Sequence, residues 1–82
     1  MTQTPATILL VDDHPLLRKG LTQLIELEDE LEVIGEANNG KTALEMAIEN
    51  EPDLIVLDLN MEGMDGLETL RAMRSAEITS RI

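Results

Sequence analysis

Thr7-Ile8-Leu9-Leu10-Val11-Asp12-Asp13, residues 7–13 of the chain, is a run of apolar and β-branched residues that stops abruptly at two acids. A short run of this kind, without alternation of polar and apolar positions, is typical of a strand buried on both faces of a sheet. We therefore predict a strand over residues 7–11, with two carboxylates at its carboxyl end.

The residues that follow this strand have helical spacing. Pro15 suits the first turn of a helix, and apolar residues then recur at positions 16, 17, 21, 24 and 25, which predicts a helix over residues 15–27. Five acids within residues 26–32 are typical of a solvated connector.

Two further strand and helix pairs follow. A second strand is predicted over residues 32–37, and Asn39 is a candidate N-cap for the helix that carries Ala43, Leu44, Ala47 and Ile48. Strand, helix, strand, helix, strand, helix is the order typical of a parallel sheet with right-handed crossovers.

The third of these units has the most strand-like segment of the chain, residues 54–59. A loop rich in Gly and Met over residues 60–64 follows it. Asp65 can cap a third helix, which carries Leu67, Leu70 and Met73 on one face.

The composition excludes several classes of function. The 82 residues include 17 acidic and 6 basic side chains, a formal charge of −11. Direct nucleic-acid binding by this chain is therefore not expected, because phosphate contacts need clustered Lys and Arg. The chain has no Cys, which excludes disulfides and thiolate metal sites, and no aromatic residue, so the core must be aliphatic. No apolar run approaches the roughly 20 residues of a membrane helix, and we expect a soluble, cytoplasmic protein without membrane contacts.

Candidate functional residues are the acids that end strands, because ligands of open parallel sheets bind outside the carboxyl ends of the strands. Asp12, Asp13 and Asp58 qualify. If the third strand lies beside the first, about 4.8 Å away, the three carboxylates form one cluster, for which Mg²⁺ is the favoured cation. Asp58 could then accept a phosphoryl group as an acyl phosphate.

Other interpretations stay open at this point. Acids at strand ends can simply face water. Residues 35–42 (GEANNGKT) fit the P-loop pattern of nucleotide-binding enzymes, although Gly35 falls within the second predicted strand, which leaves too short a loop to wrap a triphosphate. His14 precedes the helix-starting Pro15 and is expected to serve the local turn, whereas Met61 and Met64 flank the candidate site.

Three stretches carry a family resemblance: ILLVDDHPLLRKGL, EVIGEANNGKTALEMA and PDLIVLDLNMEGMDGLETL. From residue 7 to about residue 74 they resemble the first three βα units of bacterial response-regulator receiver domains. Their residues are most similar to those of the nitrate/nitrite regulators. The resemblance implies a flavodoxin-like (CheY-like) fold and a signalling domain rather than an enzyme, phosphorylated by a sensor histidine kinase in a protein that controls transcription. It matches Asp58 to the phosphoacceptor, Asp12 and Asp13 to the acidic pair that holds Mg²⁺, and Asn60 to a metal ligand through its backbone carbonyl.

The chain departs from the family pattern in two ways. Glu62 follows Met61 where these receivers usually have Pro. The family fold has five βα units and this sequence has three, so we expect residues 1–82 to be a partial receiver domain without the remaining units or a DNA-binding effector domain. The hydroxyl residue and the Lys that the family places after its fourth and fifth strands have no counterpart, since Thr42, Thr69, Lys19 and Lys41 stand elsewhere.

The family arrangement, with right-handed crossovers, implies the strand order second, first, third. The apolar third strand then lies on an open edge, without the Lys, Pro or bulge that normally protects an edge. We therefore predict a homo-oligomer that forms through this edge. A self-associating fragment without remaining chemistry is the alternative function.

Overall fold

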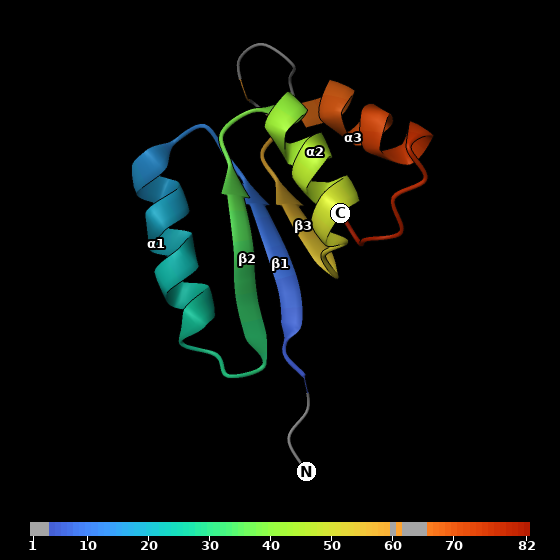
Figure 1. Cartoon of the computed structure of the whole chain (residues 1–82). Helices are drawn as coiled ribbons and strands as arrows, with labels where there is room; N and C mark the ends of the chain where they lie inside the picture. The colour runs from blue at the N-terminus through green and yellow to red at the C-terminus, as the bar shows by residue number, and fades with distance from the viewer. Residues whose placement is uncertain (1–3, 60, 62–65) are drawn as a thin grey trace.

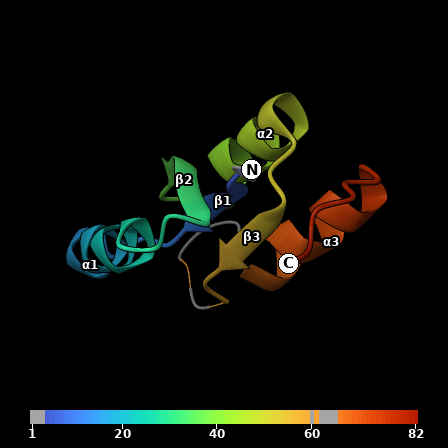
Figure 2. The same cartoon turned by 90° about the horizontal axis from the view of Figure 1, so that it is seen from below.

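The computed structural model describes residues 4–59, 61 and 66–82 of the chain. It contains the three predicted βα units, and the element order is β1 (Ala6–Val11), α1 (Pro15–Glu26), β2 (Leu31–Ala37), α2 (Gly40–Asn50), β3 (Leu54–Leu57), α3 (Gly66–Ser75). The strands form one parallel sheet in the order β2-β1-β3, which confirms the predicted topology. Helix α1 lies on one face of the sheet and α2 and α3 lie on the other, as Figures 1 and 2 show from two directions.

The register of the sheet brings the carboxyl ends of all three strands to one level. Val11, the last residue of β1, pairs with Ala37 of β2 and with Leu57 of β3. Strand β3 ends there, two residues before the predicted end, because β1 offers no further partner. The Asp58 N–H still donates to the Val11 carbonyl at 2.9 Å, which fixes the Asp58 backbone at the carboxyl end of the sheet.

The core is aliphatic, as the composition predicts, and lies mainly between the sheet and the helices α2 and α3. Alternate residues of β1, Leu9 and Val11, contribute to it, because successive side chains of a strand point to opposite faces. The other members of this cluster are Ala37, Ala43, Ala47, Ile55, Met61 and Met73. Ile8 and Leu10 are also buried, so that β1 is covered on both faces as its sequence predicts.

The apolar face predicted for the first helix is formed but is not buried. None of the twelve residues of α1 is buried, and Leu16, Leu17 and Leu24 are 87%, 54% and 64% exposed. In the part of the chain that the structure describes, α1 is the sole helix on its face of the sheet (Figure 2). Apolar side chains on the sides of α1 therefore have no neighbouring helix in that part to pack against. Helical periodicity predicts the apolar face but not what covers it.

The third helix differs in detail from the prediction. Its buried residues are Gly66, Thr69 and Met73, whereas Leu67 is 48% exposed. Leu67 and Leu70 line a groove with Leu57 and Leu59 beside the β3 edge. Asp65, the predicted cap, lies outside the described residues. Asn39 is confirmed as the cap of α2, since its side-chain oxygen accepts from the Thr42 N–H at 2.8 Å.

Among the residues that the structure describes, those that pair with the β3 edge lie at its start. Arg81 forms a parallel bridge with Leu54, and its carbonyl accepts from the Ile55 N–H at 2.7 Å while its N–H donates to the Asp53 carbonyl at 3.1 Å. The Ser80 hydroxyl donates to the Pro52 carbonyl beside this bridge. Within the described residues, β3 pairs along its length with β1 alone, which confirms that the third strand lies at an edge of the sheet.

Residues 35–42 do not form a P-loop. Gly35 lies inside β2, where a side-chain carbon in its place would come within 2.4 Å of the Met46 methyl group. Two residues, Asn38 and Asn39, separate β2 from α2, which is too short a loop to surround phosphates. No helix within the described residues is both long and apolar enough to cross a bilayer.

Candidate functional site

The three predicted acids meet at the carboxyl end of the sheet. Asp12 and Asp13 follow β1 directly and Asp58 follows β3, and the strands are adjacent and end at the same level. Asp12 is buried, while the side chains of Asp13 and Asp58 are 24% and 20% exposed. The cluster is therefore partly shielded from water but open on one side, as a site that must receive a ligand requires.

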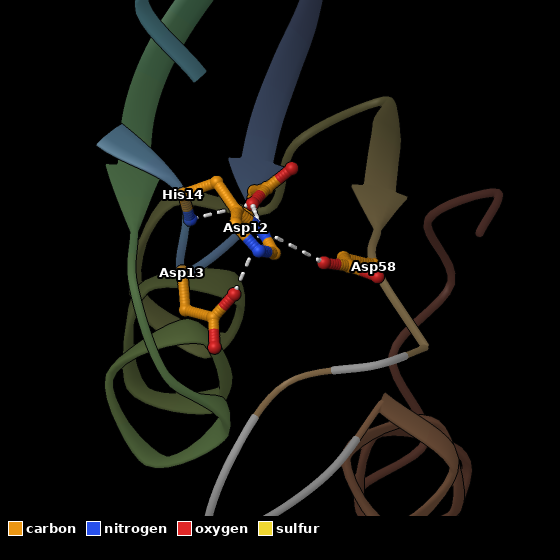
Figure 3. A group of neighbouring side chains, drawn as sticks. All are labelled: Asp12, Asp13, His14 and Asp58. Atoms are coloured by element: carbon orange, nitrogen blue, oxygen red, sulfur yellow. Dashed lines mark hydrogen bonds and ion pairs between the residues drawn. The ribbon is translucent and has the colours of Figure 1, made fainter. Parts of the chain in front are cut away.

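His14 lies among these acids, as Figure 3 shows. Its Nδ1 atom is 2.9 Å from Asp12 Oδ1, 3.0 Å from Asp13 Oδ1 and 3.7 Å from Asp58 Oδ2. The backbone N–H of His14 also donates to Asp12 Oδ1 at 2.7 Å. The expectation that His14 serves the local turn is thus correct for its backbone, but it leaves out the ring, which contacts all three acids.

The acids change the protonation of the ring. The hydrogen bond to Asp12, with smaller contributions from the charges of Asp13 and Asp58, raises the pKa of His14 above its ordinary value of 6.5. Partial desolvation opposes this rise without cancelling it. The imidazolium is therefore favoured over the neutral ring more strongly than in a free histidine.

Arg18 holds the first turn of α1 against the site. Its Nη1 donates to the Asp12 carbonyl at 2.7 Å and its Nε donates to Glu36 Oε1 at 3.0 Å. One guanidinium therefore joins the end of β1, the end of β2 and α1, and it fixes the backbone from which Asp12 and Asp13 project. Nothing in the sequence pattern of residues 15–27 singles out Arg18 as a site residue.

The loop after β3 is described only in part. Asn60, matched to a backbone metal ligand, lies outside the described residues, as do Glu62 and Met64. Met61 is 4% exposed and belongs to the core cluster, so that it fills the interior rather than presenting a partner surface.

The donor set fits a hard divalent cation. One ligand atom from each of Asp12, Asp13, His14 and Asp58 lies within 4.8 Å of the others. Clustered carboxylates repel one another, and a cation such as Mg²⁺, which accepts a few carboxylates and keeps several waters, relieves that repulsion.

His14 and Arg18 are the site residues that sequence reasoning missed. A signal existed for His14, because it directly follows the Asp12-Asp13 pair in the loop at a strand end. For Arg18 there was only its place one turn into the helix, which does not specify where a long side chain reaches.

Comparison with known proteins identifies the family of the chain. Residues 8–82 match the family model described as the response regulator receiver domain. The nitrate/nitrite response regulator protein NarL of Escherichia coli (strain K12) is 55% identical over 80 residues, which are 98% of this chain and 37% of that protein. NarP of the same strain is 48% identical over 79 residues, covering 96% of this chain and 37% of that protein.

Solved structures agree with the fold. The signal receiver domain of the putative response regulator NarL from Mycobacterium tuberculosis has a TM-score of 0.90 at 38% identity, covering 96% of this chain and 64% of that chain. Of the curated relatives NarL and NarP, by contrast, the chain spans 37% of the length. The chain belongs to the response-regulator receiver domains, with the CheY-like fold of that family and with the nitrate/nitrite regulators among its relatives.

Proposed function

We propose that this chain is the N-terminal part of a phosphoacceptor receiver and that Asp58 accepts a phosphoryl group from the phosphohistidine of a sensor histidine kinase. One observation carries the proposal: Asp58 converges with Asp12 and Asp13 at the carboxyl ends of adjacent strands. In the parent protein this phosphorylation would control transcription. The units and the effector domain that complete such a regulator lie outside these 82 residues in this proposal.

The transfer is a displacement at phosphorus. A carboxylate oxygen of Asp58 attacks the phosphorus atom, the P–N bond of the donor breaks, and the imidazole leaves with the electron pair. The product is a mixed anhydride between the Asp58 carboxyl group and phosphate. Asp58 is suited to this role because β3 fixes its backbone while its side chain stays 20% exposed.

Asp12, Asp13 and Asp58 would hold Mg²⁺, with the Asn60 carbonyl as a further proposed ligand. When bound, the ion would supply positive charge beside the transferred oxygens. The buried Asp12 accepts from the backbone N–H of His14 and therefore has a fixed orientation, whereas Asp13 and Asp58 are more open to solvent. Replacing Asp13 with Asn should weaken Mg²⁺ or Mn²⁺ binding severalfold in a calorimetric titration, and unchanged affinity would contradict this assignment.

Intact-mass measurement after incubation with acetyl phosphate and Mg²⁺ tests the phosphoacceptor. We expect slow addition of one phosphoryl group, because the family's hydroxyl and Lys have no counterpart in the chain and lost electrostatic donors cost about 10²-fold each. Asp58→Asn should abolish the addition, and Asp29→Asn, in the exposed turn before β2, should leave it unchanged. Labelling that persists in Asp58→Asn would refute the assignment.

We also propose that two copies of the chain associate along the β3 edge. The Ile55 N–H points to this edge, and alternation along a parallel strand directs the Leu57 N–H to the same side, beyond the reach of the Arg81 bridge. Apolar side chains accompany this backbone, since Val56 is 39% and Leu59 is 57% exposed. An edge of this kind favours pairing with a second strand.

Light scattering of the 82-residue chain at micromolar concentration tests the association. A species larger than 9.1 kDa is expected, and Val56→Lys should dissociate it. Ile48→Lys, at a 57% exposed position of α2, is the matched control and should not. A 9.1 kDa monomer with a cooperative melt would contradict the proposal. A chain that self-associates but is not labelled at Asp58 by acetyl phosphate would support the alternative, a self-associating fragment without chemistry.

A further inference from the structure

The ring of His14 occupies a position that the receiver assignment does not explain. The residue preceding a proline is restricted to extended backbone, and His14 has φ −103° and ψ 100°. In this backbone conformation the ring lies among the acids (Figure 3), with Nδ1 2.9 Å from Asp12 Oδ1. The sequence Asp-Asp-His-Pro therefore supplies a nitrogen donor beside the carboxylates.

Nδ1 is hydrogen-bonded to Asp12, and its distances to the acids are also compatible with those between neighbouring ligands of one metal ion. Two donors bound at about 2.1 Å to an octahedral ion lie about 3.0 Å apart when adjacent and about 4.2 Å apart when opposite. Nδ1 lies 2.9 Å and 3.0 Å from the oxygens of Asp12 and Asp13, which matches adjacent positions. Its 3.7 Å separation from Asp58 Oδ2 falls between the two values.

We propose that His14 Nδ1 is a direct ligand of the ion held by Asp13 and Asp58, and that it shifts this site toward borderline divalent ions such as Ni²⁺ and Co²⁺. The inference rests on the proposed function, since it adds a ligand to the same site. Imidazole nitrogen suits Ni²⁺, Co²⁺ and Zn²⁺, whereas Mg²⁺ prefers oxygen donors. The nitrogen should therefore strengthen Ni²⁺ binding and contribute little to Mg²⁺ binding.

Two other roles for the ring predict different outcomes. If His14 only shapes the turn, its replacement should change the affinity for every ion alike. If the ring instead fills the space of the ion, its removal should tighten Mg²⁺ binding. The turn itself survives replacement of the side chain, because it uses the His14 backbone N–H.

Calorimetric titration of the tag-free chain with Ni²⁺ and, separately, with Mg²⁺ tests the proposal at a pH of about 8, where the ligand nitrogen must be free of its proton. His14→Gln should weaken Ni²⁺ binding at least about tenfold, the lower range for loss of groups that merely support a ligand, and change Mg²⁺ binding less than about threefold. Equal changes for both ions, or tighter Mg²⁺ binding, would overturn the proposal. Asp13→Asn should weaken both.

Nuclear magnetic resonance gives a readout that is independent of affinity. His14 is the single histidine of the chain, so any paramagnetically shifted imidazole signal with Co²⁺ belongs to it. We expect such shifted ring signals in the wild type and their loss in Asp13→Asn at the same Co²⁺ concentration. A ring signal that Co²⁺ only broadens, without a contact shift, would refute direct ligation.

These results separate the inference from the proposed function. Labelled Asp58 with no selective loss of Ni²⁺ binding in His14→Gln would refute the ligand and leave the phosphoacceptor intact. A shifted His14 ring in a chain that acetyl phosphate does not label at Asp58 would support the ligand and count against the phosphoacceptor.

Discussion

Replacing Gly66 with alanine should disturb the contact that holds α3 against the end of β3. Gly66 is the buried first residue of α3. A side-chain carbon placed there would lie 2.2 Å from Leu59 Cα and 2.4 Å from the Asp58 carbonyl oxygen. Favourable contacts between carbon atoms begin near 3.5 Å, so the helix start would have to move away by roughly 1 Å or more.

Two opposing effects set the size of the change. Alanine is favoured over glycine within a helix by about 1 kcal/mol. Overpacking costs about 1–3 kcal/mol, and here the opposing atoms belong to the backbone of Asp58 and Leu59, which cannot rotate aside. Because the backbone cannot yield, we take the upper part of the overpacking cost, about 2–3 kcal/mol. After the gain of about 1 kcal/mol, Gly66→Ala should lower the free energy of unfolding by about 1–2 kcal/mol, or Tm by about 4–16 °C for a domain of this size.

Thermal melts at one protein concentration measure this change, and two other glycines are matched controls. Gly20, inside α1, has no atom within 4 Å of the added carbon, so Gly20→Ala should raise Tm. Gly35→Ala should fall between the two, because the opposing atom is the mobile methyl group of Met46. If Gly66→Ala melts at or above the wild-type temperature while Gly20→Ala is stabilising, the close contact at α3 is not real.

Three more predictions concern the stability of the fold, the first at the site and the other two at the opposite end of the sheet. The acids raise the pKa of His14 above 6.5, so the charged ring stabilises the folded state below that pH and the contribution disappears as pH rises through the folded-state pKa. The Tm difference between wild type and His14→Gln should therefore be largest below about pH 6.5 and shrink as the pH rises through the raised pKa of His14, and a constant difference would contradict this. Asp53→Ala removes an acceptor for the Thr7 N–H (2.8 Å) and hydroxyl (3.1 Å), and should lower stability in urea by about 1 kcal/mol. Glu51 has a left-handed backbone with φ 46°, so Glu51→Gly should raise stability by about 0.5–1 kcal/mol, whereas Glu49→Gly within α2 should lower it.

The helices and strands of the fold could be predicted because they depend on residues close together in the sequence. The run from Ile8 to Val11 is buried as its lack of polar residues predicts, and the Asn39 cap needs only a side chain and a backbone three residues away. The strand order required more, since right-handed crossovers alone do not order three strands, and the resemblance to receivers supplied it.

Features that depend on distant parts of the chain were harder to predict. Leu16 and Leu17 have helical spacing, but their exposure depends on what lies beyond α1, which periodicity does not describe. The end of β3 at Leu57 depends on where its partner β1 ends. The cluster of Asp12, Asp13 and Asp58 was predictable once β3 was placed beside β1, whereas the direction of the His14 ring depends on side-chain rotation that the sequence leaves open.

The sheet order has a consequence for amide hydrogen exchange. Strand β1 has a partner on each side and four successive buried residues, so its amides should exchange only when the whole domain unfolds. Strand β3 has one full partner and should exchange through smaller, local openings. Asp13 extends from the slowly exchanging strand and Asp58 from the faster one, so any ligand that bridges them also fastens β3 to β1. Its binding should slow the exchange of β3 amides while leaving those of β1 limited by global unfolding.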